Sequence, residues 1–162
     1  MMEYLETVRR NLLRHIETLT SHQLNEVVEE DAWSIAQNLE HLYLLEMSVA
    51  KGIRHAQSHG EVKPVKEKPL HLTVDRATKV PAPPYLEPST DFQTLDELKG
   101  KLAQSREILL QIIMSLTEQE MDEKSFKHPV FGTLSIRQWI TFVGHHEERH
   151  RLQIEEVKPH LS

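Results

Sequence analysis

Ser135 to Ile154 reads SIRQWITFVGHHEERHRLQI, and this stretch decides the fold. It begins with a Ser-x-x-Gln capping box, which is typical of a helix N-terminus. An inward-facing row then recurs at steps of three and four residues, as one face of an α-helix requires. The row consists of Ile136, Ile140, Val143, Glu147, His150, Ile154 and Val157. The sequence therefore predicts a long amphipathic helix whose apolar face is interrupted by a carboxylate and an imidazole.

Three further segments carry the same amphipathic pattern. The first helix is expected to end near residues 20–22, and its stripe consists of Leu5, Val8, Leu12, Ile16 and Leu19. A second helix is expected to begin with the capping box at Ser34 and to end at Gly60. Its stripe consists of Ile35, Leu39, Leu42, Val49 and Ile53. A third helix follows the capping box at Thr94, with a stripe of Leu95, Leu98, Leu102, Leu109, Ile112 and Leu116.

The segment between the second and third helices has a different composition. Residues 61–93 contain six of the eight prolines, so a long regular helix is excluded there. We expect extended chain and turns, with short strands as an option, and the segment either covers a site or serves as a passive crossover. Together these features predict an all-α protein: an up-down four-helix bundle with a long proline-rich crossover between helices 2 and 3, in one domain spanning 1–162.

Composition excludes several classes of function. The formal charge is −6, which argues against a nucleic-acid or anionic-membrane partner, since both require a basic face. No run approaches the roughly 20 apolar residues of a membrane span, and the N-terminal stretch lacks the apolar core of a signal peptide. There is no cysteine, so no disulfide, thiolate ligand or cysteine nucleophile exists in the chain. We expect a cytoplasmic protein.

Three of the 11 histidines suggest a metal site. His146 and His150 lie one helical turn apart, so both rings can reach one cation from the same face. The interval from the capping Ser34 to His41 is close to a whole number of helical turns, and so is the interval from Ser135 to His146. The two histidines therefore point in similar directions relative to the starts of their helices. We expect these three imidazoles to converge. Three histidines leave a position open for water or substrate, as in catalytic zinc sites, and the alternative is that protein hydrogen bonds satisfy the buried rings.

Two stretches carry a resemblance to a known family. Trp33–Leu42 (WSIAQNLEHL) and Arg137–Ile154, together with the intervening VPAPPYLEP and KHPVFGTLSIRQW, resemble the DinB/YfiT-like superfamily and its DinB-2 branch. The resemblance implies a four-helix bundle, commonly dimeric, with a divalent metal held at the positions of His41, His146 and His150. It also implies either a transferase that uses a low-molecular-weight thiol or a metal-dependent hydrolase.

Two carboxylates interrupt the apolar rows. Glu46 and Glu147 are candidate catalytic residues, either as acceptors for the N–H of a ligand histidine or as a general base. The alternative is an interhelical ion pair with an arginine. Trp33, Trp139 and Tyr85 lie near the expected site and are candidates for substrate contact, although packing in the core or at the helix caps is the favoured explanation for the two tryptophans.

The expected function is therefore metal-dependent chemistry on a small-molecule substrate. The metal is a divalent ion, with Zn and Ni preferred and Fe and Mn as alternatives, and the ligands do not discriminate further because imidazole suits several metals. The alternatives are a non-catalytic metal-binding protein and a dimeric structural or stress-associated bundle. A homodimer is expected from the resemblance alone.

Overall fold

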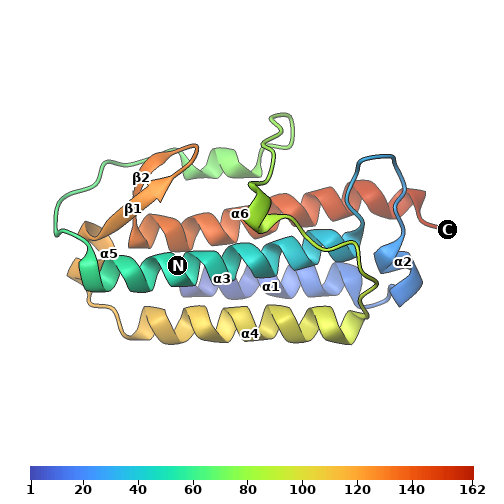
Figure 1. Ribbon diagram of the computed structural model, residues 1–162, viewed down its shortest axis with the longest axis horizontal. Coiled ribbons are helices and arrows are strands. Elements are labelled where there is room, and N and C mark those ends of the chain that lie inside the picture. Colours follow the sequence, from blue (N-terminus) through green and yellow to red (C-terminus); the bar gives the residue numbers. More distant parts are fainter.

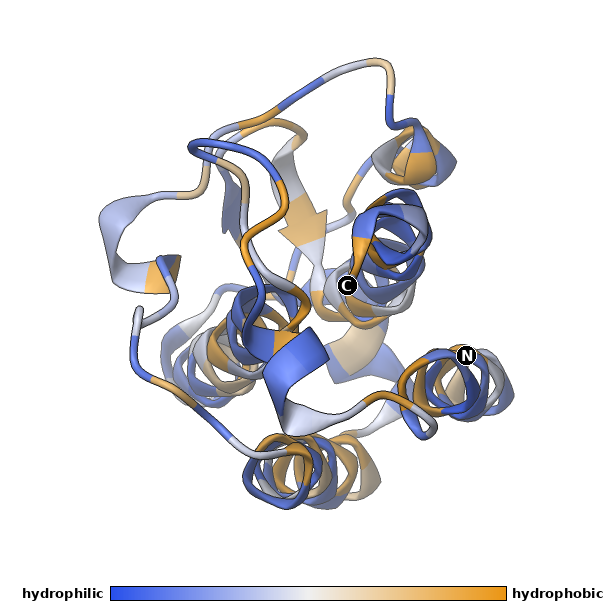
Figure 2. Ribbon diagram, turned by 90° about the vertical axis from the view of Figure 1, so that its right-hand side faces the viewer, coloured by the Kyte–Doolittle hydropathy of each residue, from blue (hydrophilic) through white to orange (hydrophobic).

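Four long helices form the four-helix bundle that the sequence predicts, but they do not alternate up and down throughout, because the second and third of them run in the same direction (Figure 1). The computed structural model describes all residues from 1 to 162, and its long helices are α1 (Met2–Ile16), α3 (Ile35–His59), α4 (Leu95–Met114) and α6 (Ile136–Val157). They run side by side along the long axis of the molecule (Figure 1), and the end-on view in Figure 2 shows their four cross-sections around a shared centre. Helix α3 packs against α4 and α6, and α1 packs against α6. No helix combines the length and the apolar character needed to cross a membrane.

The helix starts follow from local capping. Ser34, Thr94 and Ser135 each accept a hydrogen bond from the backbone N–H three residues on, and the side chain of that residue accepts one from the backbone N–H of the cap, so all three predicted capping boxes are confirmed. The first helix ends earlier than expected, at Ile16. Thr20 is instead the N-cap of a short helix, α2 (Ser21–Asn25), because its hydroxyl is bonded to a new helical turn.

The proline-rich crossover contains no strand, which corrects the expectation that short strands could form there. It contains two 3-10 helices, η1 (Leu70–Val74) and η2 (Pro84–Leu86), since proline removes the backbone donors that a sheet or long helix needs. Helix η1 lies against α6. Arg149 of α6 holds the following turn by donating hydrogen bonds to the carbonyl oxygens of Thr73, Asp75 and Thr78.

The only strands form one hairpin between α5 (Glu118–Glu123) and α6. Strand β1 (Ser125–His128) pairs antiparallel with β2 (Gly132–Ser135), and the turn reaches β2 through Gly132 at a φ of 76°. The sequence predicted a break here but not a hairpin, so the fold is all-α apart from these two short strands. The hairpin is fixed to α6 by the Trp139 indole, which donates to the Phe126 carbonyl at 3.1 Å.

The apolar core is divided into two clusters by a buried polar layer. On α1, Leu5 belongs to one cluster and Leu12 to the other, and Arg9 lies between them. On α4, Arg106 separates Leu102 and Leu109 in the same way. The polar layer also contains the two carboxylates and the three histidines that interrupt the predicted stripes. The functional residues therefore lie within the bundle rather than at one end of it.

The close approach of the hairpin to α3 gives a testable prediction about packing. A Cβ at Gly52 would lie 2.5 Å from the Phe126 ring, which stacks on Trp139 at a centroid distance of 4.4 Å. We expect Gly52→Ala to lower the free energy of unfolding by about 1–3 kcal/mol, since the steric cost exceeds the gain in helix propensity. Denaturant unfolding measures the effect.

Gly100 is the matched control on α4. A Cβ added at Gly100 would meet no atom of another part of the protein within 4 Å. Gly100→Ala should therefore raise stability by up to about 1 kcal/mol, the propensity difference alone. Equal effects of the two substitutions would contradict the packing assigned to Phe126.

Candidate metal centre

Three buried histidines converge from two helices. His41 comes from α3, and His146 and His150 come from α6, one turn apart. One ring nitrogen of each lies within 4.8 Å of the corresponding nitrogens of the other two. The convergence predicted from the sequence is confirmed.

The outer nitrogens of two rings are hydrogen-bonded to the protein. Nδ1 of His41 lies 2.8 Å from the carbonyl oxygen of Leu86, which can only accept, so Nδ1 carries the proton. Nδ1 of His150 lies 2.8 Å from Oδ1 of Asn38, whose amide nitrogen donates to the Ser34 carbonyl at 3.0 Å. That second bond sets the amide orientation and makes Nδ1 of His150 the donor. Nε2 of each of these two rings therefore carries a lone pair that can bind a cation.

The spacing of the inner nitrogens fits a bound cation. Nε2 of His41 and Nε2 of His146 are 3.1 Å apart. For metal–nitrogen bonds of about 2.0–2.1 Å, two ligands at roughly 90–110° are about 2.9–3.4 Å apart. Two lone pairs facing each other at this distance repel unless a proton or a cation lies between them. Nδ1 of His146 is buried without a partner, and a cation at Nε2 leaves it so, which means that the spacing of the inner nitrogens is the observation that indicates a cation.

The surroundings keep the three rings neutral, which is the form that binds metals. Burial lowers the pKa of His41, and its bond to the Leu86 carbonyl opposes this only in part. Burial holds the pKa of His146 and of His150 well below 6.5, and neighbouring imidazoles and Arg149 act in the same direction. A cation therefore competes with few protons for these nitrogens near neutral pH.

The centre opens onto a cavity of about 1590 Å³. Its walls come from α3, α6, the crossover and the hairpin, which Figure 1 shows on the same side of the bundle. The Trp33 ring packs against His41 at 4.8 Å and stacks near His150 at 6.2 Å. Trp139 lines the cavity from within the core, and Tyr85 lies on its wall with 68% of its surface exposed. The crossover therefore covers a site, which is one of the two roles predicted for it.

Glu46 and Glu147 do not take part in this centre, which corrects the catalytic role expected for them. Their carboxylates are bonded to the guanidinium groups of Arg9 and Arg106. Neither accepts a hydrogen bond from a ligand histidine, and neither lines the cavity. Their geometry is that of the interhelical ion-pair alternative. The backbone carbonyl of Leu86 and the amide of Asn38 occupy the acceptor positions instead.

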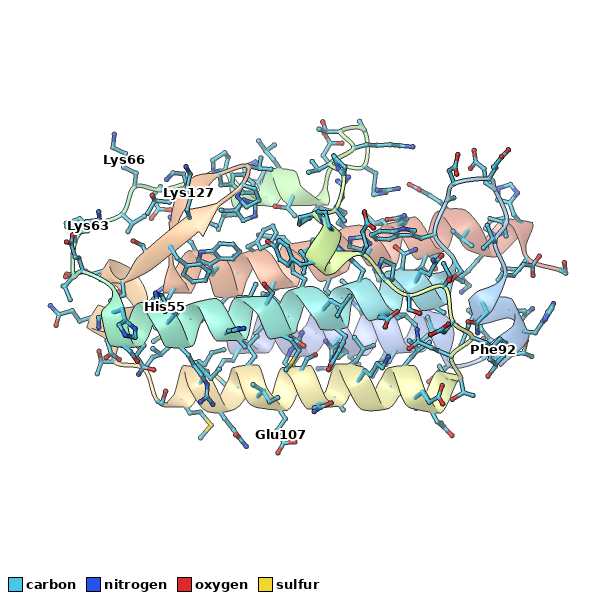
Figure 3. The ribbon with its side chains drawn as sticks, viewed as in Figure 1. His55, Lys63, Lys66, Phe92, Glu107 and Lys127 are labelled. Atoms are coloured by element: carbon cyan, nitrogen blue, oxygen red, sulfur yellow. The ribbon has the colours of Figure 1, made fainter.

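The remaining histidine pair lies elsewhere. His55 and His59 have the same i,i+4 spacing as His146 and His150, but both are exposed and no third ligand accompanies them. Figure 3 shows His55 near the C-terminal end of α3. His145 bonds the Tyr4 hydroxyl at 2.9 Å and is not part of the centre.

The hydrogen bond between His150 and Asn38 leads to a prediction about metal affinity. Asn38→Ala removes the acceptor for Nδ1–H of His150, so we expect the metal affinity to fall about 10–100-fold. Asn38→Asp keeps an acceptor oxygen in place and should retain most of the affinity. Competition titration with a chromogenic chelator measures both variants, and equal affinities for Asn38→Ala and the unchanged protein would show that this bond does not support the site.

Fold and site together define a class: a four-helix bundle with an open centre of three histidines. The chain belongs to the DinB superfamily, whose family model matches residues 4–154. It is 36% identical over 161 residues to the uncharacterized protein YuaE of Bacillus subtilis, and the match covers 99% of both chains.

Two solved structures share the fold. TT2238, described as a four-helix bundle protein, superposes with a TM-score of 0.67 at 22% identity, over 96% of this chain and 95% of the other. YfiT from Bacillus subtilis superposes with a TM-score of 0.64 at 19% identity, over 97% of this chain and 83% of the other. YfiT is described as a probable metal-dependent hydrolase with an unusual four-helix bundle topology. At these identities the two structures bear on the fold alone.

Proposed function

We propose that this protein binds one divalent cation through His41, His146 and His150 and uses it to act on a small molecule, as a hydrolase or as a thiol-dependent transferase. The observation that carries the proposal is the convergence of three neutral imidazoles at the wall of a large cavity. The description of YfiT as a probable metal-dependent hydrolase supports it. Zn and Ni are the preferred ions, with Fe and Mn as alternatives.

The number of protein ligands favours a catalytic over a structural site. Structural zinc sites are closed by four protein ligands, whereas catalytic sites have three and keep one position for water or substrate. This chain offers three ligand groups at the centre. The adjoining cavity is large enough for a small molecule to reach the fourth position.

The chemistry follows from that open position. A divalent cation held by His41, His146 and His150 would supply Lewis acidity at that position, where it would lower the pKa of water or of a thiol and so favour a nucleophile near neutral pH. The protein's own contribution is orientation: Leu86 and Asn38 fix two of the rings, and Trp33 packs against them. The chain has no cysteine, so the sulfur of a thiol transfer must come from a cosubstrate.

Elemental analysis of untagged protein, followed by an activity screen, tests the proposal. We expect about one metal ion per chain. We also expect activity either on hydrolysable esters and amides or in the transfer of a low-molecular-weight thiol, lost on chelation and restored by added metal. A protein that neither contains nor takes up metal would refute the proposal. Bound metal without either activity would favour the non-catalytic metal-binding alternative.

We further propose that the protein is a homodimer of the cytoplasm. The support is the family membership, since dimers are common among the proteins that the sequence resembles. Light scattering coupled to gel filtration tests the oligomeric state. A mass equal to that of one 18.9 kDa chain at micromolar concentration would exclude the dimer.

A further inference from the structure

His128, at the end of β1, is a buried histidine outside the three-histidine centre. Its side chain is 5% exposed and lines the same cavity as His146. Nδ1 of His128 accepts hydrogen bonds from the backbone N–H groups of Val130 and Phe131, at 3.0 and 3.2 Å. These two bonds tie the ring to the tight turn of the hairpin.

This arrangement fixes the tautomer of the ring. Because Nδ1 faces two donors, it cannot carry a proton, and the proton of the neutral ring must be on Nε2. Burial lowers the pKa of His128 to about 4, so the ring remains neutral near pH 7. Nε2–H has no hydrogen-bond partner in the protein. The atom is not completely buried, so it can be reached from outside the core. The donor is thus unpaired and partly accessible, on a residue that lines the cavity.

The surroundings of this donor are aromatic. The His128 ring meets Phe142 edge-on at a centroid distance of 4.5 Å and lies 4.9 Å from Trp139 and 5.2 Å from Phe131. Phe142 continues the wall to His146, at 5.6 Å. All of these rings line the cavity. A ligand that contacts His128 therefore lies along an apolar wall that leads to the three-histidine centre.

We propose that Nε2–H of His128 donates a hydrogen bond to an uncharged carbonyl oxygen of an aromatic or otherwise apolar small molecule, held against Phe131 and Phe142 beside the three-histidine centre. This inference rests on the proposed function, because the ligand is the small molecule on which the centre acts. His128 is thus a binding and orienting residue, and it defines the substrate class.

The chemistry of the donor selects the acceptor. A single neutral N–H within an aromatic wall suits an uncharged oxygen, whereas a carboxylate or phosphate is usually bound by a charged donor such as arginine. The neighbouring Lys127 also lines the cavity, but it does not supply that charge on the face from which His128 projects. Successive residues of a strand point to opposite faces, and Lys127 is exposed where His128 is buried. Figure 3 shows Lys127 on the outer side of the hairpin.

Two substitutions separate the donor from the turn. His128→Asn places an oxygen close to the position of Nδ1, so the two backbone bonds can persist while the Nε2–H donor is lost. His128→Gln places an amide N–H close to Nε2 but leaves the turn without its acceptor. We expect benzamide to bind about tenfold more weakly to His128→Asn, the loss of one neutral hydrogen bond, and within about threefold of the original affinity to His128→Gln.

The measurement is a titration of zinc-loaded protein with benzamide, followed by histidine ¹⁵N resonances, with toluene and benzoate as comparison ligands. Toluene should bind the original protein and His128→Asn equally, because it has no acceptor, and in the titration without metal, where no zinc can bind the carboxylate, benzoate should bind more weakly than benzamide. The absence of saturable benzamide binding, or equal benzamide affinity for the original protein and His128→Asn, would overturn the proposal. Zinc content is measured separately, and the titration is repeated without metal, so a failure of the metal site is distinguishable from a failure at His128.

Discussion

Replacing His150 with Ala should abolish stoichiometric metal binding. The ring supplies one of only three protein ligands, and no other histidine or carboxylate belongs to the group that could take its place. Loss of a supporting hydrogen bond alone costs roughly 10–100-fold in affinity, and loss of the ligand itself should cost more than about 100-fold. Metal content per chain after dialysis, measured by elemental analysis, gives the result.

His55→Ala is the matched control for that substitution. His55 is exposed on α3 and has a histidine four residues on, as His146 does, but it lacks a third ligand. Its replacement should leave metal content unchanged. If His150→Ala retained a full equivalent of metal and His55→Ala lost it, the metal would be bound near His55 and not at the three histidines. That result would disprove the assignment.

Replacing Arg106 with Met should destabilise the fold by about 3–5 kcal/mol, because it leaves two buried carboxylates facing one guanidinium. Arg106 donates to Glu46 at 2.7 Å and to Glu147 at 3.1 Å, and it also bonds the Leu5 carbonyl. Arg9 is the only other cation bonded to these carboxylates. Denaturant unfolding at neutral pH measures the loss.

Arg137→Met is the control for Arg106, since Arg137 pairs with Asp122 and Glu118 at the surface. Such exposed pairs contribute at most about 1 kcal/mol. Under conditions where Arg106→Met remains folded, it should still bind one metal ion, because the ion pairs lie outside the histidine centre. Loss of metal from the folded variant, with little change in stability, would instead support a role for Glu46 and Glu147 at the metal.

Much of the fold can be read from local patterns. The stripes at steps of three and four residues and the capping boxes at Ser34, Thr94 and Ser135 predict three of the long helices to within a few residues. These signals are local, because a cap is set by residues three positions apart. The end of the first helix was placed too late, since Thr20 begins a new helix that the stripe alone did not reveal.

The histidine ligands could be predicted, but their partners could not. His146 and His150 share a helix face, and the expected azimuth of His41 required only regular helices. The acceptors on Leu86 and Asn38 depend on where a proline-rich segment crosses α3 and how an amide rotates, which no spacing reports. For Glu46 and Glu147 the sequence left two roles open, support of the histidines or an ion pair with an arginine, because it could not place Arg9 and Arg106 next to them.

His128 was missed for the same reason. In sequence it follows a lysine and precedes a proline in a segment that only indicated a break in the helices. Its function depends on a hairpin turn that presents two backbone N–H groups to one ring nitrogen, and on the packing of that hairpin against α6. The one available signal was that Lys127 and His128 are neighbours, because neighbouring residues of a strand point to opposite faces. That signal becomes informative only once the strand is known.

Anomalous diffraction from crystals of the zinc-loaded protein, recorded at the zinc edge, tests the central claim most directly. One strong peak is expected between α3 and α6, about 2.0–2.1 Å from one nitrogen each of His41, His146 and His150. A peak confined to other histidines such as His55 and His59, or no peak with the three rings bonded only to protein groups, would contradict it.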